Sequence, residues 1–117
     1  MKIVNRATFL TMPNCTVFQK YEPCIFDELS ILYGAINDGE DFVYESLNTP
    51  GFAESTGSGD YHDLLFAMEA DGSEHALEFE GSMRDGLFDA NQLFAVWSAD
   101  DVRALIDKLQ LALGGAK

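Results

Sequence analysis

The sequence predicts an α+β domain in which an antiparallel β-sheet of about five or six strands carries two helices packed on one face. Short apolar segments rich in β-branched and aromatic residues alternate with turn residues, and a strong helical pattern follows them. The 117 residues, of which 47% are hydrophobic and 12% aromatic, suffice to bury one core. We therefore expect residues 1–117 to form a single compact acidic domain.

The first half of the chain predicts two pairs of strands. Four short segments have strand composition: residues 6–11, 16–21, 29–33 and 42–47. Pro13-Asn14 is a turn signal that predicts a hairpin between the first two segments, and Asn37-Asp38-Gly39 joins the second pair. The polar residues 48–59 are rich in Gly, Ser and Thr, so we expect a flexible loop there.

The next part predicts a helix and two strands. Asp60 is the expected N-cap of a helix over residues 60–70, which Asp71-Gly72 ends. Residues 76–80 alternate apolar and acidic side chains as in a half-buried strand, and the apolar residues 93–97 predict a central strand. We expect Phe42 and Phe66 to lie in the core.

The final element is predicted to be a helix that begins at Ser98 and ends at Gly114-Gly115. Asp100 and Asp101 lie in its first turn, where the helix dipole favours negative charge. Apolar side chains recur at helical spacing along one face: Val102, Leu105, Ile106, Leu109 and Leu113.

The charge is strongly acidic and unevenly distributed. The formal net charge is −13, from 20 acidic and 7 basic residues. Residues 21–83 contain 15 acids and neither Lys nor Arg, so the rest of the chain has a net charge of +2. Nucleic acids and anionic membranes attract Lys and Arg, and we therefore expect no direct binding to either.

No motif predicts a metal, a cofactor or a catalytic centre. Cys15 and Cys24 are nine residues apart and His62 and His75 thirteen apart, which does not match the close ligand pairs of zinc sites. The acidic turns do not fit a calcium-binding loop, and the Gly/Ser segment around Ser58 lacks the strand–turn–helix setting of a nucleophilic serine. We expect a non-enzymatic protein, cytoplasmic because it has two cysteines and no apolar run of signal-peptide or membrane-span length.

A folded body with spaced carboxylates has a charge layout like that of a nucleic-acid backbone, so the sequence favours binding to a basic protein surface. The alternative is that the acidic surface serves only solubility. We expect aromatic side chains beside the loop to supply anchors that charge lacks. The predicted partner-binding residues are Asp38, Glu40, Asp41, Glu45, Glu54, Asp60, Asp63, Glu69, Asp71, Glu74, Tyr44, Phe52 and Tyr61.

Two segments resemble small acidic proteins encoded by phages and prophages. They are RATFLTMPNCTVFQKYEPCIFDELSI at residues 6–31 and RDGLFDANQLFAVWSADDVRALI at residues 84–106. The resemblance implies a host-defence inhibitor of the anti-CRISPR kind, which blocks a nucleic-acid-binding host complex such as a CRISPR effector. The alternative hypothesis is a phage structural or assembly protein that forms oligomers, including a homodimer, through the strand at residues 93–97 and the final helix.

Overall fold

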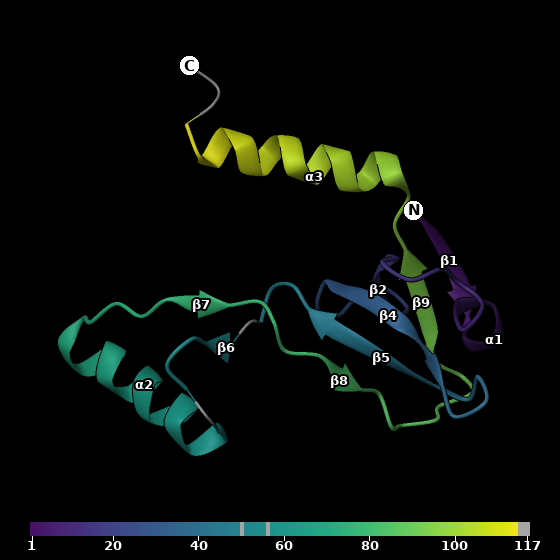
Figure 1. Ribbon diagram of the computed structural model, residues 1–117. Coiled ribbons are helices and arrows are strands. Elements are labelled where there is room, and N and C mark those ends of the chain that lie inside the picture. Colours follow the sequence, from purple (N-terminus) through teal and green to yellow (C-terminus); the bar gives the residue numbers. More distant parts are fainter. Residues whose placement is uncertain (50, 56, 115–117) are drawn as a thin grey trace.

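The structure is a computed structural model that describes residues 1–49, 51–55 and 57–114 (Figure 1). Its mixed helix and strand content confirms the α+β class. The strands are β1 Lys2–Asn5, β2 Val17–Glu22, β3 Ile25–Phe26, β4 Ser30–Ile36, β5 Asp41–Ser46, β6 Gly51–Phe52, β7 Leu77–Glu78, β8 Met83–Arg84 and β9 Leu93–Val96. The helices are α1 Arg6–Phe9, α2 Ser58–Asp71 and α3 Ala99–Ala112.

The main sheet is antiparallel, with the strand order β1-β9-β2-β4-β5-β8, and β3 pairs with the last two residues of β2. The predicted central strand is confirmed, because β9 lies between β1 and β2 and its last three residues are buried. In the register, Val96 faces Lys2 on one side and Phe18 on the other. The strands β6 and β7 pair separately as a two-stranded ribbon.

The core is an aromatic cluster on one face of this sheet. Phe9, Phe18, Phe42 and Phe94 are each at most 1% exposed, and Leu32 packs with them. Their ring centroids lie between 4.0 and 6.1 Å apart, which is the range of stacked and edge-to-face pairs. The predicted burial of Phe42 is therefore confirmed.

The predicted strand at residues 6–11 is wrong, since residues 6–9 form the one-turn helix α1. The Asn5 Oδ1 atom accepts a hydrogen bond from the Thr8 N–H at 2.9 Å, which caps α1 and ends β1. This turn places Phe9 in the core and buries Arg6. The predicted hairpin with residues 16–21 does not form, and β2 pairs instead with β9 and β4.

The longer helices do not form the layer that the sequence predicts on one face of the sheet. No residue of α3 is buried, and Figure 1 shows α3 projecting away from the sheet, with α2 at another extremity beside β6 and β7. The radius of gyration is 16.6 Å, against roughly 13 Å for a compact domain of this length. Phe66 of α2 is 64% exposed, so its predicted place in the core is wrong.

The local predictions for residues 37–80 have mixed outcomes. The turn at Asn37-Asp38-Gly39 is confirmed, and all three residues have positive φ. Gly57 rather than Asp60 is the N-cap of α2, and Gly72 ends the helix with φ 71°. The predicted strand at residues 76–80 is reduced to β7, whose two residues are exposed.

The predicted end of the final helix and the expected flexible loop each include residues that the structure does not describe. These are Pro50 and Thr56 of that loop and Gly115 of the predicted helix end. Within the described part of the loop, Gly51 and Phe52 form β6. Across the described residues, no helix is both long and apolar enough to cross a membrane.

Candidate functional site

Residues 51–55 and 57–80 project from the main sheet, and we call this part of the chain the acidic lobe. The chain leaves the sheet after β5 and returns at β8, the strand that pairs with β5. Between them lie β6, α2 and β7, which Figure 1 shows together at one side of the molecule. The lobe is therefore an insertion between two neighbouring strands of the sheet.

Phe52 is the centre of a small packed cluster inside the lobe. Its side chain is 6% exposed, and its ring centroid lies 5.5 Å from that of Tyr61 and 6.4 Å from that of His75. The backbone of the next residue, Ala53, donates from its N–H to the Ala76 carbonyl at 3.0 Å. Contacts from α2 and from both strands thus hold the lobe together.

The lobe carries eight acidic side chains and neither Lys nor Arg. All eight are exposed: Glu54, Asp60, Asp63, Glu69, Asp71, Glu74, Glu78 and Glu80. The Ser73 hydroxyl and the Ser73 backbone N–H lower the pKa of Asp71 below its ordinary value. The Glu54 carboxylate lies 3.4 Å from Nδ1 of His75, a residue that carries positive charge only when protonated. At neutral pH this surface is therefore strongly negative.

Three of these carboxylates surround a shallow hollow of about 370 Å³. The hollow is lined by Glu54, Asp60 and Asp63 together with Leu64. Lys and Arg side chains place an aliphatic stem on apolar surface and a cation near carboxylates. The composition of the hollow matches such a side chain.

Six of the ten predicted carboxylates lie together in the lobe: Glu54, Asp60, Asp63, Glu69, Asp71 and Glu74. Asp38 and Glu40 are also exposed, but they lie at the turn before β5. The strand β5, whose six residues are roughly 20 Å long, separates this turn from the chain that leads into the lobe. The structure therefore separates the predicted site into two regions.

The prediction that Asp41 and Glu45 are exposed partner-binding residues is wrong, because both side chains are buried. Asp41 is 0% exposed and accepts hydrogen bonds from Arg84 and from the backbone N–H groups of Phe42 and Gly86, at 2.9 and 3.0 Å. Glu45 is 4% exposed and accepts a hydrogen bond from the Tyr33 hydroxyl. A buried carboxylate is retained where such donors replace water.

Burial by itself raises the pKa of the Asp41 carboxyl, but the hydrogen bonds from Arg84 and from two backbone amides outweigh it, and the pKa lies below its usual value. Arg6 and Lys20 extend this charge network through Asp85, at 3.3 and 2.6 Å. The network joins α1, β2 and β5 to the segment at β8. Asp41 is therefore part of the scaffold of the sheet.

The predicted aromatic anchors are also more buried than expected. Phe52 is buried within the lobe, Tyr61 is half-buried against it, and Tyr44 packs on the core cluster near Phe18 at 6.1 Å. The lobe instead exposes other large apolar side chains. These are Phe66 at 64%, Leu77 at 53% and Phe79 at 52%.

Sequence reasoning missed Phe66, Leu77 and Phe79 as surface residues because it assigned Phe66 to the core and Leu77 and Phe79 to a half-buried strand. It also left Glu78 and Glu80 out of the site, although both belong to the same acidic stretch. The available signal was the pair of acidic residues, Glu78 and Glu80, on either side of Phe79. Among the residues that the structure describes, no three His, Cys, Asp or Glu side chains gather as a metal site would require.

The chain was compared with protein families, with curated proteins and with solved structures, and none of the three comparisons found a match.

Proposed function

We propose that this chain is a non-enzymatic interaction protein whose acidic lobe binds a basic, nucleic-acid-binding surface of a host complex. It would act as an inhibitor of the anti-CRISPR kind that occupies the site of DNA or RNA. The observation that carries this proposal is the group of eight exposed carboxylates, unmixed with Lys or Arg, on a projecting lobe. The small-domain surfaces that serve only solubility normally mix charges of both signs.

The carboxylates of the lobe would determine which partner the chain binds. Double-stranded DNA carries one negative charge per about 1.7 Å of helix axis, and its binding proteins present Lys and Arg to that charge. A surface with spaced carboxylates attracts the same groove. Such association is fast and falls steeply as salt screens the charges.

The exposed aromatic side chains of the lobe would hold the bound partner. Interface free energy comes mainly from buried aromatic and apolar anchors, while charges at the rim set the rate and the specificity. Phe66 and Phe79 are exposed aromatic side chains on the lobe, and acidic residues surround both in the sequence. We expect them to become buried in the complex.

The test is a pull-down from bacterial lysate at low and at high salt, with bound proteins identified by mass spectrometry. The bait variant D63K/E69K/E74K reverses three exposed carboxylates of the lobe. The matched control E22K/E40K/D107K reverses three exposed carboxylates outside the lobe and changes the net charge equally.

The proposal predicts that the wild-type protein and the control recover a nucleic-acid-binding complex, and that the lobe variant does not. Added duplex DNA, or the RNA that the complex binds, should displace it. Equal losses in both variants would show that only total charge matters. The proposal would be contradicted if the wild-type protein, shown by circular dichroism to be folded, recovered no protein that the lobe variant does not also recover.

A further inference from the structure

A small hollow lies on the core face of the main sheet, outside the acidic lobe. Phe18 and Lys20 of β2 share this face because they are two residues apart, and Ser30 of β4 pairs directly with Phe18. The volume of the hollow is about 150 Å³, and its lining residues are Phe18, Lys20, Asp27, Glu28, Ser30 and Tyr44. A cavity of this size holds a molecule of about six heavy atoms, such as benzene.

The floor of the hollow carries a buried hydroxyl group. Ser30 is 1% exposed and lines the hollow. Within the part of the chain that the structure describes, no group forms a hydrogen bond with the Ser30 hydroxyl. Buried polar groups in proteins normally have such a partner, because burial without one costs free energy. The Ser30 hydroxyl therefore indicates that a polar molecule occupies the hollow.

Lys20 and Tyr44 give the hollow two further hydrogen-bond donors. The Lys20 Nζ atom lies 5.8 Å from the Tyr44 ring centroid and donates to Asp85 Oδ1 at 2.6 Å. An ammonium has three N–H groups, so two remain for a ligand. Burial raises the pKa of Tyr44, Lys20 opposes this increase and nearby carboxylates add to it, so the phenol is protonated at neutral pH and can donate. Together with Ser30, these donors suit a carboxylate group.

Asp27 and Glu28 place two carboxylates at the mouth of the hollow. Asp27 is exposed and Glu28 is half-buried, whereas Ser30 is buried. The Asp27 N–H donates to the Lys20 carbonyl at 2.9 Å, which fixes this segment beside β2. Among the described residues, no Lys, Arg or His forms an ion pair with either carboxylate. The two carboxylates are therefore open to a cationic group.

These charges select a ligand that is both a cation and an anion. A simple amine would meet the Lys20 ammonium, and a simple carboxylate would meet Asp27 and Glu28, so each would bring like charges together. A zwitterion avoids both contacts, because its ammonium can lie against the carboxylates at the mouth while its carboxylate accepts hydrogen bonds from Lys20 and the two hydroxyl groups. We infer that the hollow binds a small amino acid, a zwitterion of about the size of alanine, in this orientation.

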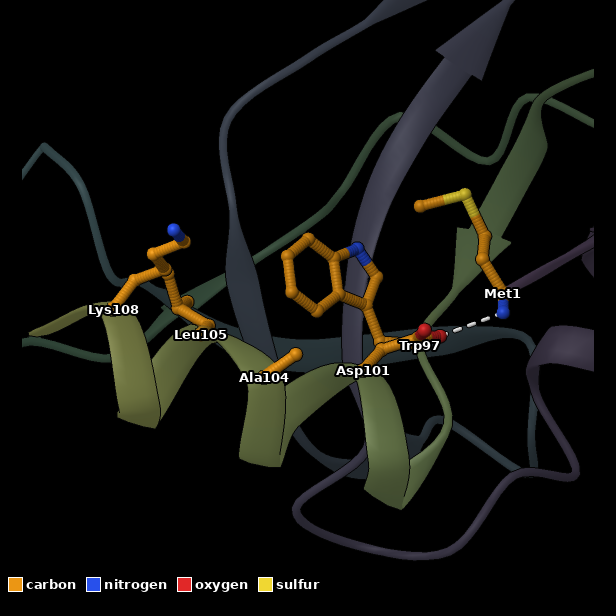
Figure 2. A pocket seen from close by; sticks show the side chains of 6 residues that line it. All are labelled: Met1, Trp97, Asp101, Ala104, Leu105 and Lys108. Atoms are coloured by element: carbon orange, nitrogen blue, oxygen red, sulfur yellow. Dashed lines mark hydrogen bonds and ion pairs between the residues drawn. The ribbon is translucent and has the colours of Figure 1, made fainter.

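The apolar groove beside α3 presents no comparable set of groups. Its volume is about 380 Å³, and Figure 2 shows the Trp97, Ala104 and Leu105 side chains that line it. The Asp101 carboxylate at this groove is already paired with the Met1 ammonium, at 2.6 Å. Its described lining residues therefore offer no unpaired carboxylate to the ammonium of a ligand. The indole N–H of Trp97 serves as an internal control for binding at the hollow.

The test is a titration of the whole chain with alanine, followed by two-dimensional NMR of the N–H groups. Saturable shifts are expected for the amides around the hollow, including those of Lys20, Ser30 and Tyr44, while the Trp97 indole N–H does not shift. Ethylamine and propionate are the matched probes, because each keeps one of the two charges of alanine at nearly the same size. Each should bind about tenfold more weakly than alanine, since it loses the hydrogen bonds of one charged group.

Five variants test the orientation of the ligand. Ser30→Ala and Tyr44→Phe each remove one hydroxyl group and should weaken alanine and propionate binding by about tenfold, with no effect on ethylamine, because the hydroxyl groups contact only the carboxylate of the ligand. Asp27→Asn removes a carboxylate at the mouth and should weaken alanine and ethylamine binding. Tyr21→Phe and Glu22→Gln are the matched controls, since neither side chain lines the hollow, and both should leave binding unchanged.

The absence of saturable shifts around the hollow, in a protein that circular dichroism shows to be folded, would overturn the inference. Equal binding of alanine, ethylamine and propionate would do the same, as would alanine binding that Ser30→Ala, Tyr44→Phe and Asp27→Asn all leave unchanged. Phenylalanine that binds as tightly as alanine would overturn the assigned size of the ligand.

Discussion

Phe9 and Phe94 lie face to face, with ring centroids 4.0 Å apart and ring planes inclined by 2°. Phe9 belongs to α1 and Phe94 to β9, so this contact joins a one-turn helix to a central strand of the sheet. Both side chains are 0% exposed. The stack is the centre of the hydrophobic core, so its removal should destabilise every strand that packs on it.

Phe94→Ala should lower the free energy of unfolding by about 3–5 kcal/mol, because it removes a fully buried ring and leaves a cavity among three other aromatic side chains. Urea denaturation followed by circular dichroism measures the loss. Phe66→Ala is the control, since Phe66 is exposed and the change should stay within about 0.5 kcal/mol. Similar losses in the two variants would mean that the core is not where the structure places it.

Asp41→Asn should destabilise the fold by about 1–3 kcal/mol, because it removes the charge of a buried carboxylate that accepts hydrogen bonds from Arg84 and from two backbone N–H groups, while Arg6 keeps its ion pair with Asp85. The folded-state pKa of Asp41 is lowered, so this stabilisation is present above the ordinary value of 3.8 and is lost as the pH falls below it. Urea denaturation at neutral and at acidic pH measures both effects.

Glu40→Gln is the control for Asp41→Asn, because Glu40 is exposed and only its backbone carbonyl contacts Arg6, at 2.8 Å. We expect little change in stability. A loss as large as that of Asp41→Asn would contradict the structural role of Asp41.

Gly34→Ala should cost about 1–3 kcal/mol, since Gly34 has φ 139°, which side chains rarely adopt. A Cβ at this position would also lie 2.9 Å from Asn14 Oδ1. Gly81→Ala should have a small effect, because no described heavy atom lies within 4 Å of the added carbon. Thermal unfolding of the two variants in parallel checks the difference.

The start of α3 should depend on pH through Asp101. A hydrogen bond from the Met1 ammonium, at 2.6 Å, and one from the Ser98 backbone lower the pKa of Asp101 from 3.8 to about 2. Its contribution to helix stability is therefore full above pH 3.8 and is lost as the pH falls through about 2. Amide hydrogen exchange of α3 measures this loss separately from the sheet.

Asp101→Asn should remove most of this pH dependence, while Asp100→Asn should preserve it because Asp100 is outside the capping box. Ser98→Ala, which removes the cap, should lower helix stability by about 1 kcal/mol. Exchange in α3 that is insensitive to all three changes would contradict the assigned cap.

Patterns that depend on neighbouring residues were predictable from the sequence. The Ser98 cap with its apolar stripe, the turn at Asn37-Asp38-Gly39 and the apolar strand β9 all agree with their local composition. The strand predicted at residues 6–11 failed because the Asn5 cap outweighs β-branched composition there. Long-range packing decided the rest, and no periodicity shows that Phe66 faces solvent.

The candidate site was predictable in its charge but not in its geometry. The run of acids without Lys or Arg located the six lobe carboxylates. It could not show that Asp41 and Glu45 point inward, because their donors lie elsewhere in the sequence: Arg84 for Asp41 and Tyr33 for Glu45. Burial of an acid depends on such distant partners.

The placement of the lobe between β5 and β8 has a consequence for how this chain can vary. These strands are neighbours, with Tyr44 opposite Met83, so the two ends of the insertion meet on adjacent strands. A short turn that replaced residues 47–82 would leave an ordinary β5–β8 hairpin and an intact aromatic core. The acidic surface can thus be removed or replaced as a single segment while the main sheet and its aromatic core remain.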